Sequence, residues 1–374
     1  MQPNMIGAYG PWAAALVDEN PSEFSFRHDR WTDVESWRVA ARQRFLQALA
    51  QPDAGPVPEA TIHQQYDFDG LHIEKLSWQL PYGPPTEAVF LKPAGSTGKL
   101  PGILALHDHA MNKFFGKQKI TRTDNTPHPL MIEHQQEYYG GRAWANEIAK
   151  RGYAVLVPDA FAFASRRVLI EDVSPEILPT PIAGESEIET YNRWADGHES
   201  IMAKSLFSAG TTWPGVFLTE DQRALDVLCD REDVDAERVG CGGLSGGGLR
   251  TVFLAGADPR IRCAVCAGMM TTWRDFLLNK SFTHTWMVYA PLLPQALEYP
   301  EILGLHLPQP TLVLNNSDDE LFTSPEMKRA DSILREAYEK AGAEDRYQCS
   351  FYPGPHKFDL DMQADAFRWF DRWL

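Results

Sequence analysis

The chain has 374 residues, of which 44% are hydrophobic and 23% are charged, so it can bury one large core or two smaller ones. Its 51 acidic side chains exceed the 35 Lys and Arg side chains, and the net charge of −16 argues against nucleic acid or an anionic membrane surface as a partner. No stretch approaches the roughly 20 apolar residues of a membrane span, and residues 1–20 lack the basic and unbroken apolar segments of a signal peptide, so we expect a cytoplasmic protein.

Residues 1–60 are predicted to form a peripheral, helical N-terminal extension. The segment TDVESWRVAARQRFLQAL begins with a helix-capping residue, Thr32 or Asp33, and three prolines between residues 52 and 58 follow it and break the helix. Its apolar side chains fall mostly on one stripe, which consists of Val34, Trp37, Val39, Phe45, Leu46 and Leu49.

Residues 61–374 are predicted to form one α/β domain. A hairpin comes first, with its turn at 81–85. Short apolar strands then alternate with amphipathic helices, a pattern typical of a mostly parallel sheet with helices on both faces. The strands are expected at 102–107, 153–159, 238–243, 261–267, 310–316 and 347–353. The helices are expected at 143–152, 221–231, 247–256 and 324–342 and at the C-terminus.

The segment at about 160–214 does not follow this alternation. Long excursions from a compact domain are usually functional or disordered, and the aromatic content here indicates an ordered, lid-like insertion. Aromatic side chains in and around it could stack on sugar rings, although packing in the core or the lid is the favoured interpretation. These are Tyr191, Trp194, Trp213 and Trp273.

The five cysteines are scattered, which argues against a disulfide framework. Cys263 and Cys266 form a C-x-x-C pair, a spacing that occurs in redox sites and zinc sites. No second pair accompanies them, so two small thiols in a buried strand are the favoured interpretation.

The stretch CGGLSGGGLR, residues 241–250, surrounds one serine with glycines at the junction of a predicted strand and a predicted helix. In that context Gly243-Leu244-Ser245-Gly246-Gly247 is typical of a nucleophile elbow, a sharp turn that lifts the serine hydroxyl above the sheet edge. Gly243 and Gly247 are expected where neighbouring chain leaves no room for a side chain. A phosphate-binding loop is the main alternative, but its Gly-Lys-Ser/Thr ending is absent.

A nucleophilic serine needs a base, and the base needs an acid that orients it. In this architecture the order along the chain is Ser, Asp or Glu, His. His356, after the last strand, is the candidate base. Asp318, Asp319 and Glu320 follow the preceding strand, and Asp319 is the preferred acid because an apolar Leu-Phe pair comes shortly after it.

The oxyanion of the tetrahedral intermediate needs backbone N–H donors. Gly246, at the start of the helix, is one candidate, and His109 in the loop after the strand 102–107 is the other, with Ala110 second. His107 and His109 flank Asp108 and could instead bind a metal, but no convincing third ligand exists. His107 is expected to anchor the loop by bonding to backbone.

Together these segments resemble the α/β-hydrolase superfamily, and within it the dienelactone-hydrolase-like and acetyl-xylan-esterase-like bacterial esterases. The resemblance covers about residues 65–374. It rests on LHDH…FGK, YAVLVPDA, RVGCGGLSGGG, DPRIRCAV, LVLNNSDDELF and YPGPHKFD. It implies the α/β-hydrolase fold and a triad of Ser245, Asp319 and His356. Dienelactone hydrolases use cysteine as the nucleophile, and Asp108 stands where glycine is commoner.

The expected function is therefore hydrolysis of carboxylic esters through an acyl-enzyme, without a metal or another cofactor. The preferred substrate is a small molecule with a short acyl group such as acetyl, for example an acetylated oligosaccharide. A peptidase of the prolyl-oligopeptidase kind and an acyltransferase are alternatives with the same triad, and a catalytically inactive binding protein is a third. Exposed apolar surface on the insertion would favour a homo-oligomer.

Overall fold

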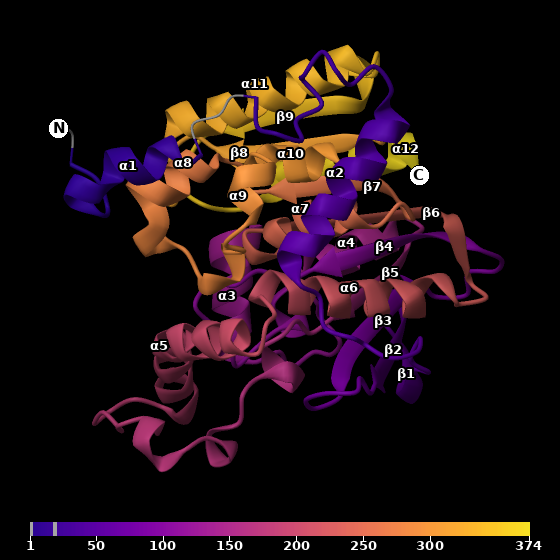
Figure 1. Ribbon diagram of the computed structural model, residues 1–374. Coiled ribbons are helices and arrows are strands. Elements are labelled where there is room, and N and C mark those ends of the chain that lie inside the picture. The colour runs from indigo at the N-terminus through magenta and orange to yellow at the C-terminus, as the bar shows by residue number, and fades with distance from the viewer. Residues whose placement is uncertain (1–2, 18–20) are drawn as a thin grey trace.

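The computed structural model describes residues 3–17 and 21–374, and within these ranges nine strands form one mixed sheet (Figure 1). The strand order is β1-β2-β3-β5-β4-β6-β7-β8-β9. Neighbours from β1 to β5 are antiparallel, and those from β5 to β9 are parallel. The strands are β1 (Thr61–Phe68), β2 (Leu71–Trp78), β3 (Thr86–Pro93), β4 (Leu100–Leu106), β5 (Ala154–Pro158), β6 (Val234–Leu244), β7 (Ile261–Ala267), β8 (Thr311–Asn316) and β9 (Tyr347–Tyr352).

Helices cover both faces of this sheet, which confirms the predicted α/β class. Alternate residues of the central strands enter two separate apolar clusters, as expected for strands that are buried on both faces. On one face lie α2 (Val34–Leu49), α6 (Trp213–Cys229), α7 (Gly246–Ala257), α10 (Tyr299–Gly304) and α11 (Ser324–Lys340). On the other lie α3 (Pro129–Tyr139), α4 (Trp144–Lys150) and α12 (Leu360–Trp373). Shorter helices are α1 (Gly10–Ala15), α8 (Trp273–Asp275) and α9 (Leu293–Ala296).

The predicted strands and helices are present, with small shifts at their ends. The largest shift is in α6, which begins at Trp213 rather than at 221, because the Thr212 side chain caps it and Pro214 favours a first turn. Cys263 and Cys266 are buried on opposite faces of β7, as the favoured interpretation of the pair stated. In the described parts of the chain no helix is long and apolar enough to span a bilayer.

Helix α2 differs from the expectation of a peripheral extension. Asp33 caps it by accepting a hydrogen bond from the Ser36 backbone at 2.7 Å, but its inner face belongs to the main core, where Trp37 and Phe45 are buried. Val39, which the sequence pattern assigns to the apolar stripe, is 61% exposed. The reason is geometric, because the buried residues follow each other at intervals of four and Val39 lies about 200° around the helix from Trp37.

The segment between β5 and α6 is ordered and contains three short 3-10 turns followed by α5 (Glu187–Ser208). In Figure 1 it extends away from the sheet toward the lower left of the view, where α5 is labelled. Tyr191 and Trp194 form a small apolar cluster of their own within it. Trp213 and Trp273 lie in the main core, so all four aromatic residues pack as the favoured interpretation stated.

Candidate active site

Ser245 lies at the sharp turn between β6 and α7, as the glycine-rich motif predicts. Its φ of 57° and ψ of −116° fall in a region that residues other than glycine rarely adopt, which costs on the order of 1–3 kcal/mol. The turn is held by a hydrogen bond from the Ser245 N–H to the carbonyl oxygen of Ala267 at 2.9 Å. The strained backbone therefore holds the hydroxyl at the end of the sheet.

Gly243 and Gly247 lie where the neighbouring backbone leaves no room for a side chain, as expected. A Cβ on Gly243 would lie 2.2 Å from the carbonyl oxygen of Leu106, and one on Gly247 would lie 2.1 Å from the same oxygen. Because both distances are far below van der Waals contact, no side chain fits at either position without moving β4.

His356 and the buried Asp319 form a hydrogen-bonded pair. The Nδ1 atom of His356 is 2.6 Å from Oδ2 of Asp319, whose side chain is fully buried. The other Asp319 oxygen accepts from the Leu321 backbone at 3.0 Å. Asp318 instead accepts a hydrogen bond from the Gly354 backbone at 2.8 Å. Of the acidic residues considered, Asp319 is therefore the one that contacts the histidine.

The His356 ring also lies against the serine turn. A Cβ on Gly268 would be 2.8 Å from Cε1 of this ring, and the residue before Gly268 is the Ala267 that bonds to Ser245. Nε2 of His356 is buried and makes no hydrogen bond to any described residue. The histidine ring thus lies beside the turn that holds Ser245, without a hydrogen bond between the two side chains.

The two predicted oxyanion donors lie side by side. A Cβ on Gly246 would approach the His109 backbone nitrogen to 2.9 Å. Gly246 is the first residue of α7, so its N–H has no acceptor within the helix. Within the described ranges no backbone hydrogen bond uses the His109 N–H. Ala110 and Met111 follow with φ of 42° and 50°, so the loop turns sharply here.

His107 anchors this loop, as expected. Its Nε2 accepts from the Ala160 backbone at 3.1 Å and its Nδ1 donates to the carbonyl oxygen of Asp108 at 2.9 Å. Burial, together with the nearby Arg250 and Lys119 charges, lowers the pKa of His107 to about 3. The ring is therefore neutral, which matches one donating and one accepting nitrogen.

Asp108, which stands where glycine is commoner in the esterases that the sequence resembles, is the centre of a buried polar cluster. Its carboxylate accepts from the Tyr139 hydroxyl, lies 3.1 Å from Nε2 of His134 and is 3.5 Å from Nζ of Lys119. Burial raises the pKa of Asp108, but the charges of His134 and Lys119 and these hydrogen bonds outweigh it and hold the pKa well below its usual value. Sequence reasoning missed the cluster, because its partners lie 11 to 31 residues away on other elements.

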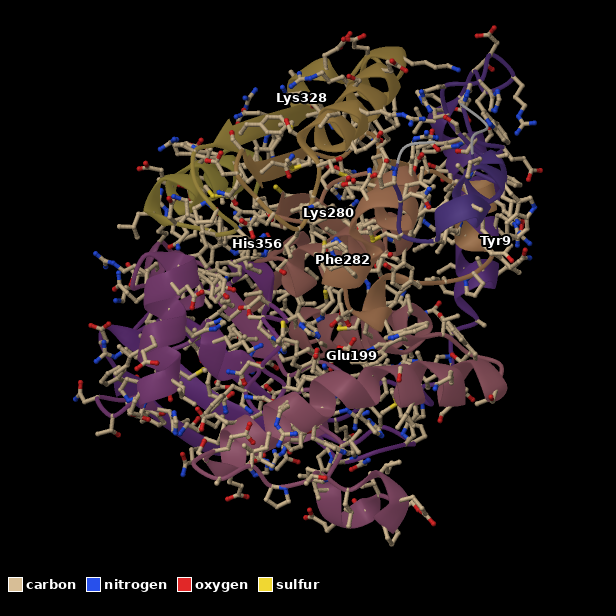
Figure 2. All side chains as sticks on the ribbon, turned by 90° about the vertical axis from the view of Figure 1, so that its left-hand side faces the viewer. Tyr9, Glu199, Lys280, Phe282, Lys328 and His356 are labelled. Atoms are coloured by element: carbon tan, nitrogen blue, oxygen red, sulfur yellow. The ribbon has the colours of Figure 1, made fainter. Side chains whose placement is uncertain are left out.

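Glu199 of α5 is a second residue that the sequence did not reveal. Its buried carboxylate contacts Nε2 of His109 at 2.7 Å and Nζ of Lys113 at 2.5 Å. It also accepts from the Thr285 hydroxyl and, at 3.0 Å, from the Trp286 backbone. The insertion is therefore joined through one carboxylate to the loop after β4 that carries His109, the candidate oxyanion loop, and to the segment before α9. In Figure 2 Glu199 and the exposed Phe282 of that segment both lie near the middle of the face that also carries His356.

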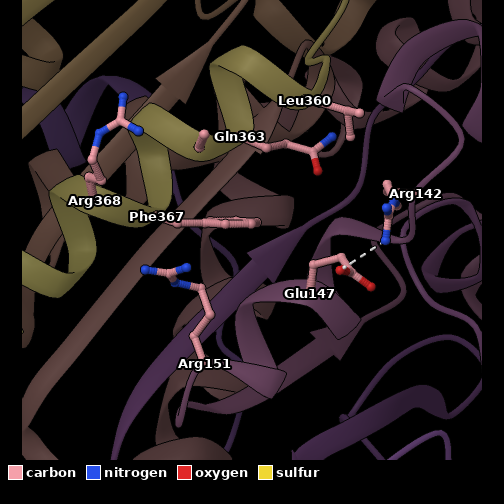
Figure 3. Close-up of a pocket in the computed structure, with 8 residues that line it drawn as sticks. Arg142, Glu147, Arg151, Leu360, Gln363, Phe367 and Arg368 are labelled. Carbon is pink, nitrogen blue, oxygen red and sulfur yellow. Dashed lines mark hydrogen bonds and ion pairs between the residues drawn. The ribbon is translucent and has the colours of Figure 1, made fainter.

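A surface pocket of about 240 Å³ lies elsewhere, between α4 and α12 (Figure 3). It contains Arg142, Arg151 and Arg368, and each of these pairs with a carboxylate of the protein. The pocket holds none of the candidate catalytic residues and offers no unbalanced positive charge to a ligand. In the described parts of the chain no group of three or more His, Cys, Asp or Glu side chains could hold a metal ion.

Comparisons with known proteins agree with this architecture. No protein-family model matches the sequence. A Bacillus subtilis protein named "Putative hydrolase YtaP" is 25% identical over 341 residues, which span 90% of this chain and 100% of the relative. A Bacteroides fragilis structure described as "a putative acetyl xylan esterase" has a TM-score of 0.70 at 16% identity, over 93% of this chain and 83% of its own. The glucuronoyl esterase from Solibacter usitatus has a TM-score of 0.62 at 15% identity, over 91% and 94%. The chain therefore has the α/β-hydrolase fold that was expected from its motifs.

Proposed function

We propose that this protein is a serine hydrolase of carboxylic esters that works through an acyl-enzyme. The observation that carries the proposal is the His356–Asp319 pair, 2.6 Å apart, which lies against the turn that holds Ser245. The resemblance to named hydrolases and esterases supports the same reaction class.

In the first half of the reaction Ser245 Oγ attacks the ester carbonyl and its proton passes to Nε2 of His356. Asp319 keeps the ring in the tautomer that can accept this proton and stabilises the positive ring that results. The N–H groups of Gly246 and His109 hold the oxyanion, and loss of one such donor lowers kcat by roughly 10²–10³-fold. His356 then protonates the departing alcohol, so the acyl group remains on Ser245.

In the second half a water molecule gives its proton to His356 and attacks the acyl-enzyme. The tetrahedral intermediate again places its negative oxygen between Gly246 and His109. Collapse of this intermediate returns the proton to Ser245 and releases the acid. This chemistry uses only side chains and backbone groups of the chain.

The substrate that we propose is a short-acyl ester, preferably an acetyl ester of a carbohydrate. Two structurally similar proteins are named as an acetyl xylan esterase and a glucuronoyl esterase, and these names support a carbohydrate substrate. Two partly or fully exposed aromatic side chains, Phe282 and Trp286, lie on the segment that Glu199 joins to the oxyanion loop. Their exposed rings are suited to stacking on a sugar, which the buried tryptophans of the core are not.

The test is hydrolysis of p-nitrophenyl acetate, butyrate and octanoate by the wild type and by Ser245→Ala. We expect acetate to be cleaved fastest and the variant to lose at least about a thousandfold in kcat, as removal of a triad member does in other serine hydrolases. A wild type that cleaves none of the three esters contradicts the proposal. A variant that keeps its activity shows that another residue is the nucleophile.

A further inference from the structure

Lys119, in the short turn Lys117–Lys119, is a fully buried cation behind the oxyanion loop. Its Nζ donates to the carbonyl oxygen of Asp108 at 2.9 Å and to that of His109 at 2.8 Å. The nearest carboxylate oxygen, that of Asp108, is 3.5 Å away. Both hydrogen bonds of this ammonium group therefore go to the backbone of one loop.

These two carbonyls belong to the peptide units that carry the candidate oxyanion donor His109 and the second choice, Ala110. The Asp108 carbonyl is joined to the His109 N–H, and the His109 carbonyl is joined to the Ala110 N–H. Resonance couples the two ends of a peptide unit. A positive charge at the oxygen therefore draws electron density from the nitrogen and makes its hydrogen a stronger donor, since hydrogen bonds in a chain polarise one another.

The charge itself needs an explanation, because burial of an ammonium group is costly unless it is paired and hydrogen-bonded. A neutral donor could hold the same two carbonyls in place. The Asp108 carboxylate meanwhile contacts His134 and Tyr139, so Lys119 is not its only partner. The charge adds a fixed positive potential at the carbonyl end of the peptide unit whose N–H end faces the oxyanion. Because this charge is already in place, no group has to reorient when the oxyanion forms.

We propose that Lys119 is a positioning residue that fixes and polarises the oxyanion hole of the esterase site. The proposal rests on the proposed function of that site. It assigns to Lys119 an effect on the transition state, where the oxyanion exists, and little effect on substrate binding.

Loss of the Lys119 proton should therefore weaken catalysis. The charged and titratable groups around it are His107, Asp108, His109, Lys113 and Asp159, with His134 and Tyr139 behind Asp108. Burial lowers the pKa of Lys119 to about 8, against the opposing charges of Asp108 and Asp159. The ammonium form is present below this pH, so kcat/KM should decline as the pH rises above about 8.

The experiment compares Lys119→Met and Lys119→Arg with the matched control Lys117→Met. Lys117 is also largely buried and pairs with Asp159 at 2.7 Å and Glu87 at 2.9 Å, but it does not contact the two carbonyls. For each protein, kcat and KM are measured with p-nitrophenyl acetate, together with Ki for an alkylboronic acid. The boronic acid adds to Ser245 Oγ, the hydroxyl proton passes to His356, and the tetrahedral boronate carries its negative charge in the oxyanion position.

For Lys119→Met we expect kcat to fall by roughly 10–100-fold, a part of what loss of a whole donor costs, with KM within about threefold of wild type. The boronate Ki should rise by the same factor as kcat/KM falls. Lys119→Arg should retain more activity than Lys119→Met, and Lys117→Met should keep its kcat. Equal kcat and Ki in Lys119→Met and wild type overturn the inference while the proposed function stands. A wild type that neither cleaves the ester nor binds the boronic acid overturns the proposed function itself.

The pH profile keeps the inference testable if Lys119→Met does not fold. The wild type must lose kcat/KM above about pH 8, and Lys119→Arg must not, because a guanidinium stays protonated there. A wild-type profile that stays level to pH 10, or an identical decline in the arginine variant, overturns the proposal.

Discussion

Asp318 and Asp319 are neighbours in the sequence but have different partners in the structure. Asp319 bonds to His356, whereas Asp318 accepts from the Gly354 backbone. Asp319→Asn should lower kcat about 10⁴-fold, because the amide favours the wrong histidine tautomer. Asp318→Asn, the matched control, keeps an oxygen for Gly354 and should change kcat less than about threefold. Steady-state kinetics with p-nitrophenyl acetate distinguish the two, and a larger loss in Asp318→Asn would contradict the assignment of the acid.

At this scale the sequence predicts the placement of residues whose position is set by local geometry. Ser245 could be predicted because a strand, a tight turn and a helix lie within a few residues of each other, and His356 because its position after the last strand follows from the fold. Asp108 and Glu199 could not, because their partners come from distant segments. The Glu199 contacts, for example, join residues 86 to 90 positions apart. Only the folded chain shows that these carboxylates are buried and paired.

Helix α5 is the part of the insertion that contacts the candidate active site, and it does so through Glu199. Burial raises the pKa of Glu199, but the hydrogen bonds and charges of His109 and Lys113 outweigh it and hold the pKa well below its usual value of 4.5. A carboxylate with a depressed pKa stabilises the folded state above its unfolded-state pKa, and this contribution is lost as the pH falls through the folded-state value. The docking of α5 should therefore weaken in acid, from about pH 4.5 downward.

Glu199→Gln should weaken the same docking at neutral pH, because it leaves Lys113 buried without its counter-ion. Loss of one partner of a buried ion pair costs about 3–5 kcal/mol. We expect faster hydrogen exchange in residues 187–208 and a lower melting temperature, and a smaller further loss of stability in acid than the wild type shows. Glu187→Gln at the exposed start of α5 is the control and should behave as wild type. Unchanged exchange in Glu199→Gln would show that other contacts hold the insertion.

Over the whole molecule, the predicted alternation of strands and helices is correct because the central strands are mostly apolar and buried on both faces, while the helices either have an apolar face or, like α7, are buried throughout. The assignment of α2 to a peripheral extension failed for a physical reason. Its sequence shows a helix and a cap but does not show which surface its apolar face meets. That surface includes α7, the helix that follows Ser245, where the rings of Phe45 and Phe253 lie 5.6 Å apart, and it also includes α6 and α9.

We therefore propose that residues 1–60 and 61–374 unfold as one cooperative unit. Phe45→Ala removes a fully buried ring that joins α2 to α7, and it should lower the free energy of unfolding by about 3–5 kcal/mol. Val39→Ala, on the exposed face of the same helix, should change it by less than about 0.5 kcal/mol. Urea unfolding followed by tryptophan fluorescence and by loss of esterase activity should give coincident transitions that shift together in Phe45→Ala. If α2 instead unfolded alone, Phe45→Ala would produce an early fluorescence change at urea concentrations where activity persists, because the proposed catalytic residues all lie beyond residue 100.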